Sequence, residues 1–347
     1  MNVVFRVDAS SHQMGVGHLM RCLALADELE KQNHNVTFIC RELKGNLIKS
    51  IEHRVLILPI DKDFQSDDLY LSWLGATQEQ DAKQTIQVIH DNADLLIVDS
   101  YALDEVWHKQ LKPHTKKIMV IDDLADREFD CDVLLNQNLG SQKEDYQGQV
   151  PNNCKLLLGC DYALLRSEFA KFRERAIEKR KNTTEIKNIL ISMGGSDKNN
   201  VTYDVLQQLD DDFNVVVVLG GASQHKKMIK EYVKNKSIKV KVIVNADNMA
   251  ELMLKADLAI GAGGTTSLER CCLGLPTLLY VLSENQKRIA ENLVQLGAVM
   301  IVRNLENDFQ ALVDDFSLWQ FMSSKSQSIC DGLGTEKVVA HLGSLQK

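Results

Sequence analysis

Short runs of β-branched and other apolar residues alternate with helix-like stretches along almost the whole chain. Nine runs are expected to form strands: Val3–Val7, Val36–Ile39, Leu95–Val98, Ile118–Ile121, Ile189–Ile191, Val215–Leu219, Val240–Ile243, Leu258–Ile260 and Thr277–Val281. Strands that are apolar at every position are typical of parallel sheets covered by helices on both faces. The repeated strand–helix order therefore predicts an α/β protein with doubly wound parallel sheets.

The length of 347 residues, 44% of them hydrophobic, predicts two domains. A strongly charged helical stretch lies near the middle of the chain, and a new strand–helix series starts after it. We expect an N-terminal α/β domain at 1–165, a linker helix at 166–185 and a second α/β domain at 186–330. A C-terminal helix at 331–347 is expected to pack back on the first domain. Two similar domains of this kind predict a cleft that holds the ligand.

The charge and the cysteines exclude several classes of function. A net charge of −8, without a block of basic residues, argues against nucleic-acid binding. The eight cysteines form no CxxC pair, so neither a zinc site nor another metal site is expected. The longest apolar runs have strand length, and no leader pattern is present, which predicts a cytoplasmic protein that does not cross a membrane.

The first glycine-bearing loop follows the first strand and contains Gly15 and Gly17. It resembles a dinucleotide-binding fingerprint only superficially, because Met20 occupies the third glycine position. A nicotinamide or flavin cofactor is therefore not expected, and we predict no other cofactor.

Two further loops combine a preceding strand, glycines and a following helix. Their candidate ligand-binding residues are Gly194, Gly195 and Ser196 in one loop and Gly263, Gly264, Thr265 and Thr266 in the other. Backbone N–H groups at such helix starts favour anions, and two loops in one domain suit a diphosphate. The alternative is a pair of tight turns without a ligand. Neither loop has the lysine of a P-loop, which argues against hydrolysis of a nucleoside triphosphate.

Glu269 has two interpretations. The spacing of Thr266 and Glu269 matches a capping box, which would make the carboxylate structural. A carboxylate one turn into a helix beside a phosphate loop is also suited to bind both hydroxyls of a ribose. The spacing alone favours the cap.

His18 is the candidate general base. It lies in the first turn of an expected helix, whose positive end opposes protonation and keeps the imidazole neutral. Arg21 lies on the same side of that helix, three residues later, and is a candidate substrate-binding residue together with Gly15 and Gly17. The alternative is a histidine that only bonds a neighbouring carbonyl. Asp8 and the strand-end pair Asp122 and Asp123 are candidates to orient the base or bind sugar groups, unless they merely cap turns. Asp99 and Tyr101 end another strand and are expected at the same ligand-facing edge.

Eight segments, in chain order, resemble the PseG family, the UDP-2,4-diacetamido-2,4,6-trideoxy-β-L-altropyranose hydrolases of pseudaminic acid biosynthesis. The segments are Arg6–Ser10, Gly15–Ala26, Val120–Arg127, Asp161–Phe169, Ser192–Asp197, Gly261–Glu269, Gly274–Pro276 and Glu284–Gln286. The run around His18 is specific to the family. The Gly261–Glu269 run is shared more widely by GT-B glycosyltransferases, including MurG-like enzymes.

The resemblance implies a GT-B-like fold and metal-independent, inverting hydrolysis at the anomeric carbon. It implies that His18 activates water and that the family's tyrosine and asparagine correspond to Tyr101 and Asn285. The two later glycine loops would hold the UDP diphosphate, and Glu269 would contact its ribose. The partner is then a small UDP-sugar, and the protein is expected to be a monomer. The alternatives are a GT-B glycosyltransferase with a UDP-sugar donor and a non-catalytic sugar-nucleotide binding protein.

Overall fold

The computed structural model describes residues 1–8, 16–89, 93–195, 197–210, 212–221, 223–234 and 239–344. The chain divides into two compact units. Unit 1 comprises Met1–Leu164 and Gly334–Lys347, and unit 2 comprises Leu165–Leu333. Each unit contains one parallel sheet, which confirms the α/β class that the alternating pattern predicts.

Unit 1 is built on a seven-stranded sheet with the order β3-β2-β1-β4-β5-β6-β7. Its strands are β1 (Asn2–Val7), β2 (Asn35–Arg41), β3 (Arg54–Leu58), β4 (Leu95–Asp99), β5 (Ile118–Ile121), β6 (Val133–Asn136) and β7 (Lys155–Leu158). Its helices are α1 (Gly17–Lys31), α2 (Leu69–Leu74), α3 (Gln78–Val88), α4 (Glu105–Leu111) and α13 (Gly334–Ser344). Short 3₁₀ turns are η1 (Ile48–Ser50), η2 (Lys112–His114), η3 (Lys143–Tyr146) and η4 (Cys160–Tyr162).

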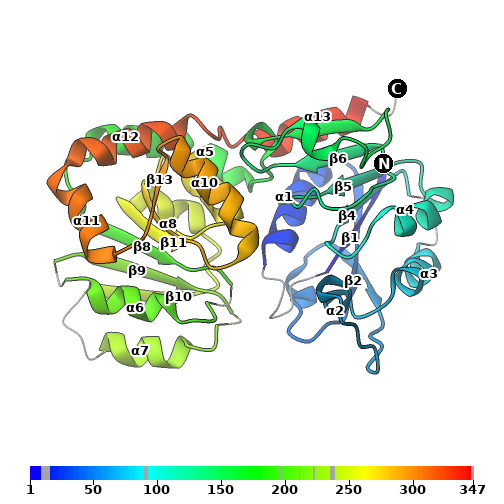
Figure 1. Ribbon diagram of the computed structural model, residues 1–347, viewed down its shortest axis with the longest axis horizontal. Helices are drawn as coiled ribbons and strands as arrows, with labels where there is room; N and C mark the ends of the chain where they lie inside the picture. The colour runs from blue at the N-terminus through cyan, green and yellow to red at the C-terminus, as the bar shows by residue number, and fades with distance from the viewer. Residues whose placement is uncertain are drawn as a thin grey trace. The chain divides into compact units, whose positions relative to one another are not determined.

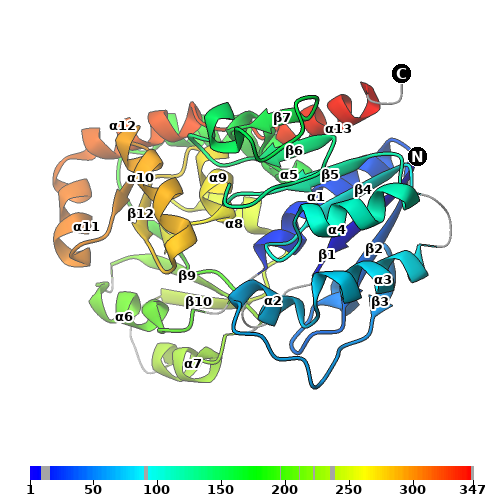
Figure 2. The same ribbon diagram turned by 45° about the vertical axis from the view of Figure 1, so that its right-hand side comes forward.

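The two faces of this sheet bury separate apolar clusters, because successive side chains of a strand point to opposite faces. Phe5 packs on the face covered by α1 and α13, whereas Val4 packs on the face covered by α2, α3 and α4. Helices α3 and α4 lie side by side on their face (Figure 2). Helix α13, drawn in red in Figure 1, adds Val338, Val339 and Leu342 to the core beneath α1.

A buried ionic network lies on the α3 side of unit 1. The carboxylate of Asp81 in α3 accepts hydrogen bonds from Arg6 at 2.6 and 3.1 Å and from Arg41 at 2.6 Å. The indole of Trp107 donates a further bond at 3.0 Å. All of these side chains are fully buried, and although burial alone raises the pKa of Asp81, the two arginines lower it below its usual value. Asp81 therefore compensates two buried cations at once.

We expect Asp81→Ala to destabilise the protein by about 3–5 kcal/mol, because it leaves two buried guanidinium groups without their shared carboxylate. Urea-induced unfolding followed by circular dichroism measures the loss. Asp126→Ala is the matched control, since the Asp126 carboxylate is 48% exposed in its ion pair with Arg127, and an exposed pair contributes about 0–1 kcal/mol. Equal losses in the two variants would contradict this role of Asp81.

Unit 2 contains a six-stranded sheet with the order β10-β9-β8-β11-β12-β13. Its strands are β8 (Asn188–Ser192), β9 (Asn214–Leu219), β10 (Lys239–Val244), β11 (Leu258–Ala262), β12 (Thr277–Tyr280) and β13 (Val299–Ile301). Its helices are α5 (Ser167–Asn182), α6 (Val201–Gln208), α7 (Lys226–Lys234), α8 (Met249–Lys255), α9 (Thr265–Cys272), α10 (Lys287–Gln295), α11 (Leu305–Asp314) and α12 (Phe316–Gln327), with the 3₁₀ turn η5 (Glu284–Gln286).

Helices α6, α7 and α11 bury apolar side chains in one cluster with the central strands of this sheet. Helix α5, which the sequence suggests as a linker, packs against α8 and α9 and is part of unit 2. Its Arg180 donates hydrogen bonds to the backbone carbonyls of Met253 and Ala256, at the end of α8. The buried guanidinium of Arg180 thus bonds carbonyl groups that have no partner within the helix at the end of α8.

Candidate functional site

The strand order of unit 1 reverses direction between β1 and β4. Connections leave these two neighbours toward opposite sides, and ligands of open α/β sheets bind outside the carboxyl ends of the strands at such a point. Strand β4 ends at Asp99 there, and α1, which follows β1, begins at Gly17. His18 is the second residue of that helix, so the topology brings it to the same edge as Asp99.

His18, Asp99 and Arg21 form a buried cluster at this edge. Nδ1 of His18 lies 2.6 Å from Oδ1 of Asp99. Arg21 donates two hydrogen bonds to the same carboxylate, from Nε to Oδ2 at 2.6 Å and from Nη2 to Oδ1 at 2.7 Å. The three residues are at most 7% exposed. The thiol of Cys22 also lies 3.4 Å from Oδ2 of Asp99.

Electrostatics assign the proton in this cluster. Burial alone raises the pKa of Asp99, but the charges of Arg21 and His18 and their hydrogen bonds outweigh it, and the pKa lies well below its usual range. An ionised carboxylate only accepts hydrogen bonds, so Nδ1 of His18 carries the proton at this short distance. Nη2 of Arg21, 3.1 Å from Nδ1, is then a neighbouring donor and not a bonding partner.

The other imidazole nitrogen, Nε2, makes no hydrogen bond with any residue in the described part of the chain. With Nδ1 protonated, Nε2 of the neutral ring has a free lone pair and can accept a proton. A histidine whose Nδ1–H is held by a carboxylate is oriented for use as a general base. The ring also packs edge-on against Tyr101, with 4.6 Å between the ring centroids. The rings of Tyr101 and Tyr70 are neighbours in turn, with 5.2 Å between their centroids.

Asp8 lies in the buried network on the other face of the sheet. Its Oδ1 accepts hydrogen bonds from the side chain of Arg6 at 2.8 Å and from the backbone N–H of Arg41 at 2.9 Å. The His18 imidazole instead donates its Nδ1–H to Asp99. The expectation that Asp8 orients the base is therefore corrected, since alternate strand residues point to opposite faces.

Asp122 serves the turn that follows β5. Its Oδ2 accepts hydrogen bonds from the backbone N–H groups of Leu124 and Ala125 and from the hydroxyl of Tyr146 at 2.8 Å. Burial raises the pKa of Asp122, although Arg127 opposes this shift. The turn-capping alternative fits these contacts, and Asp122 does not orient His18.

The loops of unit 2 lie at a second reversal of strand order, between β8 and β11. Gly194 follows β8 with φ +85°, and Gly264 follows β11 with φ +124°. A Cβ at either position would meet no atom within 4 Å, so open space lies above both backbones. Gly195 belongs to the first of these loops, whereas Ser196, like Gly15 of unit 1, lies outside the described residues.

The second loop leads directly into α9. Gly264 is the residue before the helix, and Thr265 and Thr266 form its first turn together with Ser267. The N–H groups at the start of a helix have no partner within the helix, so they are available to an anion. Gly263 lies against Gln286 of η5, and a Cβ there would come within 3.2 Å of the Gln286 Cβ. Asn285 is in the same turn, but its side chain lies outside the described part.

Glu269 does not form the capping box that its spacing suggests. Helix α9 begins at Thr265, two residues too early for Thr266 to be its N-cap, and no side chain caps it. The carboxylate of Glu269 makes no hydrogen bond with the described residues. Burial raises its pKa to about 7, against the opposing charges of Arg166 and Arg270. An acceptor group without a partner therefore lies one turn into the helix that follows the loop.

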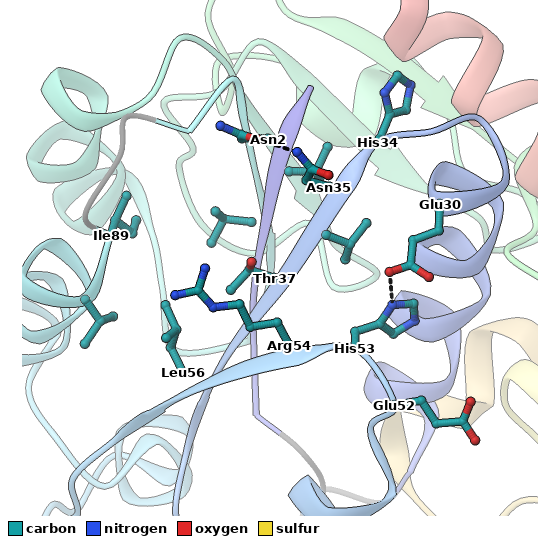
Figure 3. Close-up of a pocket in the computed structure, with 14 residues that line it drawn as sticks. Asn2, Glu30, His34, Asn35, Thr37, Glu52, His53, Arg54, Leu56 and Ile89 are labelled. Atoms are coloured by element: carbon teal, nitrogen blue, oxygen red, sulfur yellow. Dashed lines mark hydrogen bonds and ion pairs between the residues drawn. The ribbon is translucent and has the colours of Figure 1, made fainter.

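A hollow of about 740 Å³ lies elsewhere on unit 1. It surrounds the amino ends of β1, β2 and β3, at the edge opposite to His18. In Figure 3, Thr37 and Arg54 lie on one side of these strands, and Glu30 and His53 lie on the other. Both ring nitrogens of His53 are paired, with Asp27 at 3.0 Å and Glu30 at 2.9 Å. These side chains do not converge on one ligand position, so we do not assign the site there.

Across the described ranges, no three histidine, cysteine or acidic side chains are grouped so that they could hold a metal ion. None of the helices in those ranges combines the length and the apolar character that a membrane span needs.

Comparison with known proteins agrees with these observations. Residues 167–328, within unit 2, match the model of the glycosyltransferase family 28 C-terminal domain. Over 86% of its length the chain is 29% identical to the UDP-2,4-diacetamido-2,4,6-trideoxy-β-L-altropyranose hydrolase of Campylobacter jejuni, of which it covers 97%. The resemblance to the PseG hydrolases is thereby confirmed.

Two further relatives extend the comparison. An uncharacterized protein of Methanocaldococcus jannaschii is 32% identical over 83% of this chain, which spans 57% of that relative's length. The spore coat polysaccharide biosynthesis protein SpsG of Bacillus subtilis is 25% identical over 96% of both chains.

Solved structures agree on the fold. MurG of Acinetobacter baumannii superposes with a TM-score of 0.69 at 16% identity. The match covers 99% of this chain and 100% of the MurG chain. The UDP-GlcNAc 2-epimerase of Neisseria meningitidis, solved with UDP-GlcNAc bound, superposes with a TM-score of 0.62 at 15% identity. The match covers 99% of this chain and 100% of the epimerase chain. The expected GT-B-like architecture of two Rossmann-like units is therefore confirmed.

Proposed function

We propose that this chain is a UDP-sugar hydrolase that cleaves the anomeric C–O bond of UDP-2,4-diacetamido-2,4,6-trideoxy-β-L-altropyranose with inversion. The observation that carries the proposal is the His18–Asp99 pair at the carboxyl edge of β1 and β4. The carboxylate holds Nδ1 of the buried histidine, and Nε2 makes no hydrogen bond with the described residues. The similarity to the C. jejuni hydrolase over nearly all of that enzyme supports the substrate.

The proposed chemistry in unit 1 is activation of water. Nε2 of His18 takes a proton from a water molecule while the water oxygen bonds to the anomeric carbon. The bond from that carbon to the diphosphate oxygen breaks, and its electron pair leaves with UDP. Attack from the face opposite to the leaving group inverts the anomeric centre. Asp99 keeps the Nδ1–H in place and stabilises the imidazolium that forms.

The proposed role of unit 2 is to bind UDP. Backbone N–H groups of the loop at Gly194 and Gly195 and of the start of α9 would meet the diphosphate charge, which grows as the bond breaks. Glu269 would accept hydrogen bonds from the ribose hydroxyls. UDP is a good leaving group, so this scheme needs no protein acid. Tyr101 and Asn285 are proposed to contact the sugar, as the resemblance implies.

The test is to incubate the purified chain with UDP-2,4-diacetamido-2,4,6-trideoxy-β-L-altropyranose without any acceptor and in the presence of EDTA. Mass spectrometry and proton NMR would follow the products. We expect equimolar UDP and free sugar, with the anomeric signal of the inverted sugar appearing first. Binding of the UDP-sugar without turnover would instead support a non-catalytic binding protein.

A glycosyltransferase is the second candidate, because the matching domain of unit 2 carries that family's description. In that case UDP release would require an acceptor, and the sugar would appear in a conjugate. The same experiment repeated with candidate acceptors separates the two activities. UDP release that is independent of any acceptor would reject the transferase.

Glu269→Gln is expected to change stability and UDP affinity in opposite directions. The folded-state pKa of about 7 lies above the unfolded value near 4.3, so stability is lost as pH rises between these values. The variant avoids this loss and should melt at a higher temperature than the parent at pH 8, but not at pH 4. UDP affinity at pH 8 should fall about tenfold, because charge-assisted bonds to the ribose are lost.

Calorimetric titration with UDP and thermal melting at both pH values measure these effects. Glu291→Gln, at an exposed position of α10, is the matched control and should change neither quantity. Unchanged UDP affinity combined with higher stability at pH 8 would mean that Glu269 does not bind the ribose.

A further inference from the structure

Asp123 is the last of four linked side chains: His18 bonds Asp99, Asp99 bonds Arg21, and Arg21 bonds Asp123. It directly follows Asp122 beyond the end of β5, and its Oδ2 accepts a hydrogen bond from Nη1 of Arg21 at 2.9 Å. Its other oxygen, Oδ1, is buried and has no hydrogen-bond partner within the described structure. We propose that Asp123 is a positioning residue, which acts through Arg21 to fix Asp99 and to supply negative charge for the protonated state of His18. This inference rests on the proposed function.

The first argument is geometric. Two carboxylates hold every nitrogen of the Arg21 guanidinium, with Asp99 bound to Nε and Nη2 and Asp123 bound to Nη1. A planar guanidinium held on two sides cannot turn in its plane. Oδ1 of Asp99 also receives the Nδ1–H of His18, so a turn of the guanidinium would move the imidazole. Asp99 resists that turn from one side, and Asp123 is the second anchor that opposes it.

The second argument is the balance of charge. Arg21 neutralises one of the two carboxylates, so the cluster has one net negative charge while His18 is neutral. Among the described residues, Cys22 and Tyr101 beside the cluster are neutral. The cation Arg127, which bonds the carbonyl of Ser100, is already paired with Asp122 and Asp126. When Nε2 takes a proton, the cluster becomes neutral. Asp123 therefore supplies the charge that favours proton transfer to His18, and in a buried site such a charge acts strongly.

The neighbouring carboxylate cannot replace it. Asp122 points away from the cluster, toward the backbone N–H groups of its own turn and the hydroxyl of Tyr146. Its Oδ1 is paired with Arg127 at 3.1 Å. The two adjacent aspartates thus have different roles, with Asp122 holding the turn and Asp123 holding Arg21.

The experiment compares Asp123→Asn with the control Asp126→Asn, three residues later and 48% exposed. In steady-state hydrolysis of the UDP-sugar we expect Asp123→Asn to lower kcat about 10- to 100-fold. KM and the affinity for UDP should remain within about twofold, since neither Asp123 nor Arg21 is proposed to hold UDP. Asp123→Glu should recover part of the loss because it restores the charge. The control should retain the parent's kcat.

A second readout does not require activity. Nitrogen-15 NMR of the histidine side chains reports the Nδ1–H of His18, which we expect to exchange slowly with water in the parent and faster in Asp123→Asn. If the parent hydrolyses nothing, the proposed function fails, while the NMR comparison still tests the role of Asp123. An unchanged kcat together with unchanged Nδ1–H exchange in a folded Asp123→Asn variant would overturn the inference. If that variant does not fold, Asp123→Glu takes its place. A reduced kcat with faster Nδ1–H exchange in Asp123→Glu supports the inference, and parent-like Nδ1–H exchange overturns it.

Discussion

Replacement of His18 by Gln is expected to lower kcat by about 100- to 10,000-fold, the usual contribution of a general base. The Gln amide has a similar volume, but it cannot accept a proton in place of Nε2. UDP affinity should remain within about twofold, because the loops proposed to hold UDP belong to unit 2. Steady-state kinetics with the UDP-sugar and calorimetric titration with UDP measure the two quantities.

The matched control is His34→Gln. His34 precedes β2, at the amino edge of the same sheet, and should not affect turnover. Turnover of His18→Gln within tenfold of the parent would keep the hydrolase but reject His18 as its base. A loss of UDP affinity in the same variant would instead indicate that the substitution disturbs the fold.

The architecture could be predicted because buried parallel strands leave a clear pattern. All nine expected strands exist. Strands β3, β6, β7 and β13 are not among the expected ones. These strands have only three to five residues and lie at or near a sheet edge, so their short apolar runs do not stand out from loops.

The candidate site could be predicted only in part. His18 and Arg21 are three residues apart, and their proximity follows from helix geometry. The contact of His18 with Asp99 joins residues 81 positions apart and depends on β4 lying beside β1. Sequence periodicity identifies strands, but it does not give their order in the sheet. The sequence therefore places Asp99 at the ligand-facing edge, but it does not single out Asp99 over Asp8 and Asp122 as the partner of His18.

The capping interpretation of Glu269 fails for a local reason. A capping box needs Thr266 as the residue before the helix, but Gly264 takes that position because its φ of +124° suits glycine and starts α9 earlier. Sequence spacing locates such a boundary only to within a few residues. The two-residue difference changes Glu269 from a capping residue to a carboxylate available to a ligand.

Asp99→Asn tests whether the carboxylate sets the proton position on His18. An amide in place of Asp99 can present its NH₂ group to the ring, which then carries its proton on Nε2 and loses the lone pair that faces the substrate. We expect kcat to fall by about 1,000-fold or more, as expected when the residue that orients a catalytic histidine loses its charge. Kinetics and nitrogen-15 NMR of the ring measure the loss and the tautomer.

Asp104→Asn is the control, because this N-cap of α4 follows the same strand and Asn caps a helix as well as Asp does. Retention of more than a tenth of the parent's kcat in Asp99→Asn would contradict the assigned role. The double variant His18→Gln/Asp99→Asn gives the sharper result. Because Asp99 is proposed to act only through the imidazole, the double variant should be no slower than His18→Gln alone. An additive loss would mean that Asp99 acts on the substrate independently of His18.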